Sequence, residues 1–279
     1  MQILQRLKAQ PASDGAGVKM HRLAGFNAAS HFDPLLMLDE FNSDEPRDYL
    51  AGFPPHPHRG FETISYLKVG AMAHEDHLGH RGLVTSGGIQ WMRAGRGIIH
   101  SEMPSQQDGR LHGFQLWLNL PGALKMSAPQ YRDFASGELP EFSHGNHRLK
   151  LLAGSLTIAG HGYRAPLDSG ATALRYLDLA FGDGQPLALP LQRGDTALLY
   201  VYQGEVKVQG QTLGAREALL LRNGAQAEIE LQATAGSQAL LLLGQPLGEP
   251  VAHYGPFVMN SREELEQAVR DYQAGQLTG

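Results

Sequence analysis

The chain has 279 residues, of which 42% are hydrophobic and 18% charged, and its formal net charge is −5. This is the composition of a folded globular protein, and the length predicts about two domains or one large domain. The sequence contains no cysteine. It therefore excludes disulfides, thiolate zinc sites, iron–sulfur clusters and cysteine nucleophiles.

No stretch of the sequence has the character of a targeting or membrane-spanning segment. Residues 1–8 lack the apolar core of a signal peptide, and no apolar run approaches the ~20 residues that cross a bilayer. The chain also has no block of Lys and Arg residues of the kind that binds nucleic acid. We therefore expect a cytoplasmic monomer with neither a membrane nor a nucleic acid as a direct partner.

Most of the chain has the pattern of short strands separated by Gly, Pro and Asp. In one example, Phe114, Leu116 and Leu118 alternate with Gln115 and Trp117, which is the period of a strand. Many short strands with frequent turns predict an all-β fold of the sandwich or barrel type. The expected strands cover residues 61–68, 89–93, 113–120, 174–181, 196–208, 226–231 and 238–243.

Two local signals refine this outline. Residues 202–205 contain Gly204 between two apolar runs, which predicts a hairpin turn. The polar stretch 136–147 predicts a domain boundary near residue 140, with strand-rich segments on both sides. We therefore expect two β domains, one over residues 1–140 and one over residues 141–279.

One helix is predicted near the C-terminal end. Ser261 and Glu264 have the spacing of a capping box, and Gly275 is placed to end the helix. We expect the helix to pack on a sheet through an apolar stripe at positions i, i+3, i+4 and i+7: Leu265, Ala268, Val269 and Tyr272.

Chemistry is expected where the histidines concentrate, since seven of the 13 lie between His56 and His112. His56 and His58 are two residues apart, and so are His100 and Glu102. In a strand, residues at i and i+2 point to the same face, with Cα atoms about 6.5–7 Å apart. Three imidazoles and a carboxylate on neighbouring strands would bind one divalent transition metal: iron(II), manganese, nickel or copper.

The spacing alone leaves the carboxylate ligand open. Glu62 lies four residues after His58, which would be the same face of a continuous strand. Glu62 and Glu102 therefore compete for this role. A second metal site at His74, His77 and His80 is not favoured, because the three cannot converge easily on a strand or a helix. We expect these three histidines to be either exposed or placed behind the metal ligands.

Longer runs of sequence carry a specific resemblance. The chain resembles the pirin family of the cupin superfamily over nearly its whole length. The matching segments are Asp39-Glu40-Phe41, His56-Pro-His-Arg-Gly-Phe-Glu-Thr63, Met72-Ala-His-Glu-Asp76, Gln90-Trp-Met-Arg-Ala-Gly-Arg-Gly97, His100-Ser-Glu-Met-Pro104 and Gly255-Pro-Phe-Val-Met-Asn260.

The resemblance implies two cupin domains of the jelly-roll type, of which the N-terminal one (1–140) binds a single metal, usually iron. It implies His56, His58, His100 and Glu102 as the metal ligands, which leaves Glu62 behind them. The C-terminal domain (141–279) has no His-x-His pair, so we expect it to lack a metal. Phe53, Trp91 and Met92 flank the ligand segments and are either core or pocket wall.

The resemblance also implies an activity. Pirins resemble quercetin 2,3-dioxygenase, so the expected substrates are a flavonol-like small molecule and O2, with carbon monoxide released on ring opening. Glu102 is the expected catalytic base because it is ionisable and close to the metal. The alternative is a non-catalytic iron-binding regulator that acts on transcription factors or metabolic enzymes through protein contacts.

Overall fold

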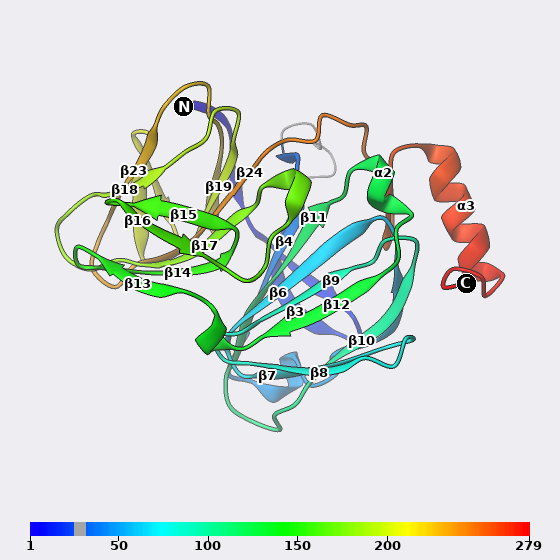
Figure 1. Cartoon of the computed structure of the whole chain (residues 1–279). Helices are drawn as coiled ribbons and strands as arrows, with labels where there is room; N and C mark the ends of the chain where they lie inside the picture. The colour runs from blue at the N-terminus through cyan, green and yellow to red at the C-terminus, as the bar shows by residue number, and fades with distance from the viewer. Residues whose placement is uncertain (25–31) are drawn as a thin grey trace. The chain divides into compact units, whose positions relative to one another are not determined.

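A computed structural model describes residues 1–24 and 32–279 of the chain (Figure 1). The chain divides into two compact units. Residues 10–24, 35–136 and 247–279 form the histidine unit, and residues 1–9, 32–34 and 137–246 form the leucine unit. Strands dominate both units, so the predicted all-β class is confirmed. The domain boundary near residue 140 stays a prediction.

The histidine unit is built mainly from two antiparallel sheets. Its strands are β2 (Gln10–Asp14), β3 (Val18–Ala24), β4 (Leu35–Ser43), β5 (Phe53–His58), β6 (Phe61–Val69), β7 (Ala71–Asp76), β8 (Arg81–Thr85), β9 (Ile89–Arg93), β10 (Ile98–Pro104), β11 (Leu111–Asn119) and β12 (Gln130–Phe134). One sheet has the order β12-β9-β6-β11-β4-β3-β2, and the other has the order β5-β10-β7-β8. The two sheets face each other (Figure 1). Ser65 on β6 and Gln115 on β11 donate hydrogen bonds across the space between them to Glu102 on β10.

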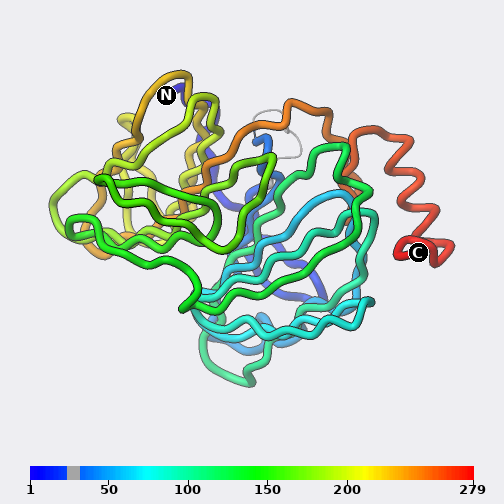
Figure 2. Tube along the Cα trace, in the orientation of Figure 1, coloured from blue at the N-terminus to red at the C-terminus, as the bar shows by residue number. Residues whose placement is uncertain are grey.

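The C-terminal segment completes this unit, and Figure 2 traces it in orange and red. It contains β25 (Ala252–Tyr254), β26 (Phe257–Met259) and α3 (Arg262–Gln273), while α2 (Gly122–Lys125) and the 3-10 turn η2 (Pro46–Asp48) lie earlier. The predicted capping box of Ser261 and Glu264 is present. Helix α3 packs on β25 and β26 through Leu265 and Ala268. Val269 packs against the same cluster, and the ring of Tyr272, although 44% exposed, contacts the ring of Phe257 on β26 with centroids 6.3 Å apart. All four residues of the predicted stripe therefore lie on the side of the helix that faces β25 and β26.

Two buried cations fasten the C-terminal segment beside the end of β5. Arg59 pairs with Asp271 at 2.7 Å and donates to the carbonyl of Leu277 at 3.3 Å. The Lys125 ammonium donates to the carbonyls of Gly60 and Val258 at 2.8 and 3.1 Å. Because β26 and α3 are held by residues that directly follow His58, the segment is part of the architecture around the histidines.

The leucine unit has the same two-sheet plan. Its strands are β1 (Gln2–Lys8), β13 (Glu141–His144), β14 (His147–Ala153), β15 (Ser155–Ile158), β16 (His161–Arg164), β17 (Arg175–Ala180), β18 (Leu187–Pro190), β19 (Thr196–Gln203), β20 (Glu205–Val208), β21 (Gln211–Gly214), β22 (Glu217–Arg222), β23 (Glu228–Ala233) and β24 (Gln238–Gly244), with 3-10 turns η3 (Ser136–Glu138) and η4 (Gly170–Thr172). The sheet orders are β1-β22-β19-β24-β17-β14-β13 and β18-β23-β20-β21, and β15 pairs with β16. A core of Leu, Val, Ile and Ala side chains fills the unit.

The predicted hairpin at residues 202–205 is wrong. Strand β19 pairs with β22 and β24, whereas β20 pairs with β21 and β23. The chain therefore passes from one sheet to the other at Gly204, whose φ is 72°. An apolar run on each side of a glycine identifies a turn, but it does not say which strands pair. In the described parts of the chain, no helix is long and apolar enough to span a membrane.

Candidate metal centre

Three histidine rings meet on the inner face of the sheet that contains β5 and β10. The antiparallel register places His56 opposite His100, and His58 follows on the same face. The ring centroids are 4.4 Å apart for His56 and His100, 4.7 Å for His56 and His58, and 5.1 Å for His58 and His100. One nitrogen from each ring can be chosen so that all three lie within 4.8 Å of one another.

The nitrogens of these rings fit a metal ion. Nε2 of His100 and both ring nitrogens of His58 are buried and make no hydrogen bond of normal geometry within residues 1–24 and 32–279. Nδ1 of His56 donates to the carbonyl of Pro54 at 2.8 Å, so Nε2 keeps its lone pair. Buried acceptors without partners are costly. A divalent transition metal satisfies three imidazole lone pairs together, so the residues present suit such an ion.

Burial prepares two of the rings for this role. It lowers the pKa of His58 well below the usual 6.5, and the neighbouring His56 lowers that pKa further. It also lowers the pKa of His100 well below 6.5, and His58 and His56 add to this effect. Neutral imidazole is the form that binds metals. His58 and His100 are therefore in the ligand form at neutral pH.

Glu102 lies two residues after His100 on β10 and is 1% exposed. Its Oε1 accepts a hydrogen bond from the Ser65 hydroxyl at 3.0 Å, and its Oε2 accepts one from the Gln115 amide at 3.2 Å. Glu102 borders the same pocket as His56 and His58, but it is outside the three-histidine group. Its role as a fourth ligand stays a prediction.

A pocket of about 660 Å³ opens beside the rings. Apolar walls are formed by Met37, Phe53 and Trp117, and by Pro54, Pro55 and Pro57. A polar wall includes Arg22, which pairs with both Asp39 and Asp14 at 2.7 Å. Burial raises the pKa of Asp39, and Arg22 opposes that rise. The pocket therefore combines the rings of His56 and His58, apolar walls and a cluster of paired charges.

Comparison with known proteins identifies the family. The family model for pirin matches residues 17–118, and the model for the pirin C-terminal cupin domain matches residues 176–278. A pirin-like protein of Caulobacter vibrioides is 46% identical over 274 residues, which are 98% of each chain. The chain belongs to the pirin family. The predicted pair of cupin domains is thereby confirmed.

Two further relatives of this pirin-family chain carry the name of an activity. A protein of Pseudomonas aeruginosa, provisionally named quercetin 2,3-dioxygenase, is 46% identical over 277 residues, or 99% of this chain and 97% of that one. A solved structure of quercetin 2,3-dioxygenase from Acinetobacter baumannii superposes with a TM-score of 0.90 at 28% identity, and the match covers 99% of this chain and 98% of that one.

Glu62 does not lie on the face expected from its spacing. Strand β5 ends at His58, and Gly60 (φ 92°) turns the chain into β6 of the other sheet. Ser65 reaches Glu102 between the sheets, so Glu62, an odd number of residues away, faces the outer side of its sheet. There it pairs with Arg93 at 2.8 Å. Burial raises the pKa of Glu62, and Arg93 opposes that rise.

His74, His77 and His80 lie in different environments. His74 is buried against His100, while His80 is exposed and its Nδ1 contacts Asp76. His77 is exposed. Among the described residues, the group at His56, His58 and His100 is the one that could hold a metal.

Phe53, Trp91 and Met92, which the sequence assigns to either the core or the pocket wall, differ in position. Phe53 borders the pocket, whereas Trp91 and Met92 do not. Met92 packs with Ala94 and Ile98 in a small core cluster. Arg22 and His253, which do border the pocket, were not identified from the sequence. Their positions in β3 and β25 carry no local signal, because the pocket joins segments that are far apart in the chain.

Proposed function

We propose that the histidine unit binds one divalent transition metal, most readily iron(II), through His56, His58, His100 and Glu102. Manganese, nickel and copper are the alternative ions. We further propose that the protein is a dioxygenase that opens the central ring of a flavonol such as quercetin. The observation that carries this proposal is a set of three converging imidazoles, of which His58 and His100 are buried with lowered pKa values, beside a largely apolar pocket of about 660 Å³. The relatives named quercetin 2,3-dioxygenase support the substrate class.

Glu102 is the proposed catalytic base. A metal held by the three histidines would act as a Lewis acid toward the 3-hydroxyl and 4-carbonyl oxygens of the flavonol and lower the pKa of that hydroxyl. A carboxylate oxygen of Glu102 then accepts the hydroxyl proton. Ser65 and Gln115 orient the carboxylate by one hydrogen bond each. Because Glu102 is 1% exposed, bulk water does not compete for the proton.

The pocket walls would bind and shield the flat substrate. Phe53 and Trp117 offer aromatic surface, and three prolines stiffen the part of the wall formed by β5. Asp39 and Asp14, held by Arg22, offer acceptors for phenolic hydroxyls. A planar polyphenol fits this combination of apolar slot and hydrogen-bonding end.

The proposed reaction balances without another reductant or oxidant. Loss of the 3-hydroxyl proton leaves an electron-rich ring that reacts with O2. The two bonds to ring carbon 3 break, and that carbon leaves with its own oxygen as carbon monoxide. Both atoms of O2 stay in the product, one in an ester and one in a carboxyl group. The proton held by Glu102 returns to that carboxyl group.

The test is metal analysis combined with flavonol turnover on one preparation. Metal-free protein is loaded separately with iron(II), manganese, nickel and copper, and carbon monoxide and flavonol absorbance are followed under air. The double variant His56→Ala, His58→Ala is the control, and we expect it to lose both metal and turnover. If wild type binds metal but releases no carbon monoxide with any of the four ions, the regulatory alternative is favoured.

A further inference from the structure

The three metal-facing rings differ in what lies behind them. His56 donates its Nδ1 proton to a neutral backbone carbonyl, that of Pro54. Nδ1 of His100 instead faces Nδ1 of His74 at 3.4 Å. Nε2 of His74 faces Oδ2 of Asp76, also at 3.4 Å. Within the described chain, His100 is therefore the metal-facing ring that connects through a second imidazole to an anion.

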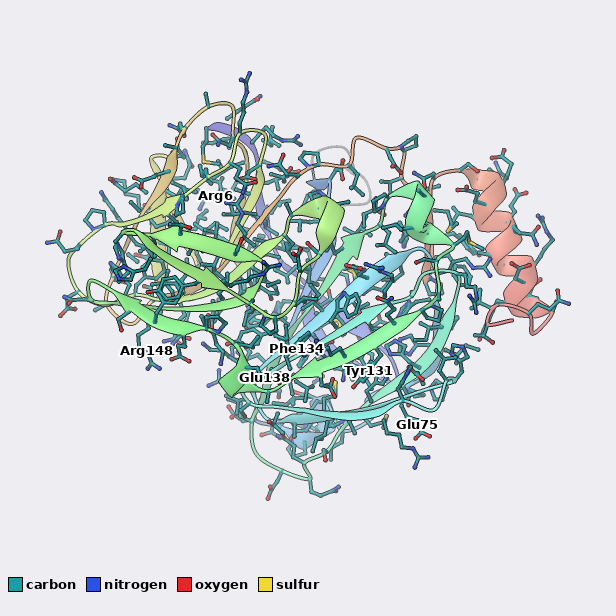
Figure 3. All side chains as sticks on the ribbon, viewed as in Figure 1. Arg6, Glu75, Tyr131, Phe134, Glu138 and Arg148 are labelled. Atoms are coloured by element: carbon teal, nitrogen blue, oxygen red, sulfur yellow. The ribbon has the colours of Figure 1, made fainter. Side chains whose placement is uncertain are left out.

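Strand pairing fixes this arrangement. In the register of β10 and β7, His100 lies opposite Asp76 and Glu102 lies opposite His74. His74 is thus the diagonal neighbour of His100 on the same face. The side chains of His74 and Asp76 are both fully buried. The ring of Tyr131, labelled in Figure 3, stacks on His74 with centroids 4.1 Å apart and an angle of 19°. The imidazole of His74 is therefore confined.

The contacts of Asp76 determine where the protons lie. Its Oδ1 accepts from the backbone N–H groups of Leu78 and His80 at 2.9 and 3.1 Å. Its Oδ2 contacts Nδ1 of His80 at 2.8 Å. An ionised carboxylate only accepts, so His74 donates from Nε2; when His74 is a neutral imidazole, its Nδ1 is then the acceptor. His100 then donates from Nδ1, which leaves the lone pair on its buried, unpartnered Nε2.

We propose that His74 and Asp76 are positioning residues for the metal ligand His100. They hold His100 in the Nδ1–H tautomer with Nε2 directed at the metal. They also make His100 the strongest donor of the three imidazoles, because a hydrogen bond that leads to a carboxylate raises the basicity of a metal-bound imidazole. This inference rests on the proposed metal site and deepens it.

The experiment measures binding of cobalt(II) alone to the full-length metal-free protein, by competition with a chelator. Asp76→Asn removes the charge, and His74→Phe removes the connecting nitrogens but keeps a ring to stack on Tyr131. We expect each variant to bind cobalt(II) about 10- to 100-fold more weakly and to shift the visible absorption bands of the bound cobalt. The matched control is Glu75→Gln. Glu75 neighbours Asp76 on β7 but is exposed and paired with Arg81 (Figure 3), so we expect wild-type affinity.

The double variant separates positioning from general damage. If His74 and Asp76 act on His100 through one connection, the double variant should bind cobalt(II) as tightly as the single variant with the lower affinity. The losses of the two single variants should not add. Wild-type cobalt affinity and spectrum in either single variant would overturn the inference, and so would additive losses. Asp76 also holds the turn after β7, so thermal melting of each metal-free variant is measured. His74→Phe leaves that turn intact and carries the test if Asp76→Asn unfolds. If the wild-type protein itself binds no cobalt(II), the proposed metal site is refuted, and not only the positioning role of His74 and Asp76.

Discussion

Replacing Glu102 by Gln separates the proposed base from the proposed metal ligands. The change removes the charge and the ability to accept a proton while it keeps the shape of the side chain. The Ser65 hydroxyl can rotate and the Gln115 amide can flip, so both present partners of Glu102 can bond to the new amide. We therefore expect the free energy of unfolding to change by less than about 2 kcal/mol.

Turnover is expected to fall much more than stability. General-base contributions are about 100- to 10,000-fold, which corresponds to about 3 to 5 kcal/mol of barrier. Metal content should remain substantial, because His56, His58 and His100 are untouched and an amide oxygen still coordinates weakly. The assay follows carbon monoxide release and loss of flavonol absorbance under air, with metal content measured on the same samples.

Glu62→Gln is the matched control, since Glu62 and Glu102 are each 1% exposed. Glu62 faces the other side of its sheet and pairs with Arg93, so the control should lose about 1–3 kcal/mol of stability and keep its turnover per folded molecule. The assignment of Glu102 is refuted if Glu102→Gln turns over like wild type while Glu62→Gln is inactive.

Three further predictions concern the metal and the fold. His56→Ala with His58→Ala should abolish metal loading but leave the far-ultraviolet circular dichroism unchanged; undiminished metal content would exclude these ligands. Arg59→Met should cost about 2–3 kcal/mol in urea unfolding, because it removes the donor to Oδ2 of Asp271 and to the carbonyls of Arg96 and Leu277; an unchanged midpoint would contradict this. The pKa values of His58 and His100 are lowered in the folded protein, so below pH 6.5 these two histidines bind protons in the unfolded chain but not in the folded one. Metal-free protein should therefore lose up to about 1.4 kcal/mol per histidine and pH unit on acidification through that range, and flat stability from pH 7 to 5 would contradict this.

The sequence predicted the local features of the site well. The i, i+2 pairs needed only strand geometry, and His56 and His58 indeed share a face with His100. The capping box at Ser261 likewise depends on neighbours three residues apart. These features are set by short-range geometry, so a pattern of residue types was enough to find them.

Features that depend on a change of sheet were not predictable in the same way. The four-residue spacing places Glu62 on the face of His58 only if residues 58–62 form one continuous strand, but the chain changes sheets at Gly60. A Cβ at Gly60 would lie 2.0 Å from the carbonyl oxygen of Val258. Because Val258 lies almost 200 residues further along the chain, the local sequence around Gly60 does not predict this close approach. The same applies to Gly204, where an expected hairpin is a crossing between sheets.

Strand β10 explains why the site and its supporting residues form together. It pairs with β5 on one side, which brings His56 opposite His100, and with β7 on the other, which brings His74 opposite Glu102. A slip of one residue in either pairing would turn a whole set of side chains to the opposite face. The β5 pairing already contains an irregularity between His100 and Glu102, so the β7 pairing, which is regular from His100 to Pro104, sets the spacing of those two residues. Residues on β7 therefore influence the metal centre twice, through the register of its strand and through the contact of His74 with His100.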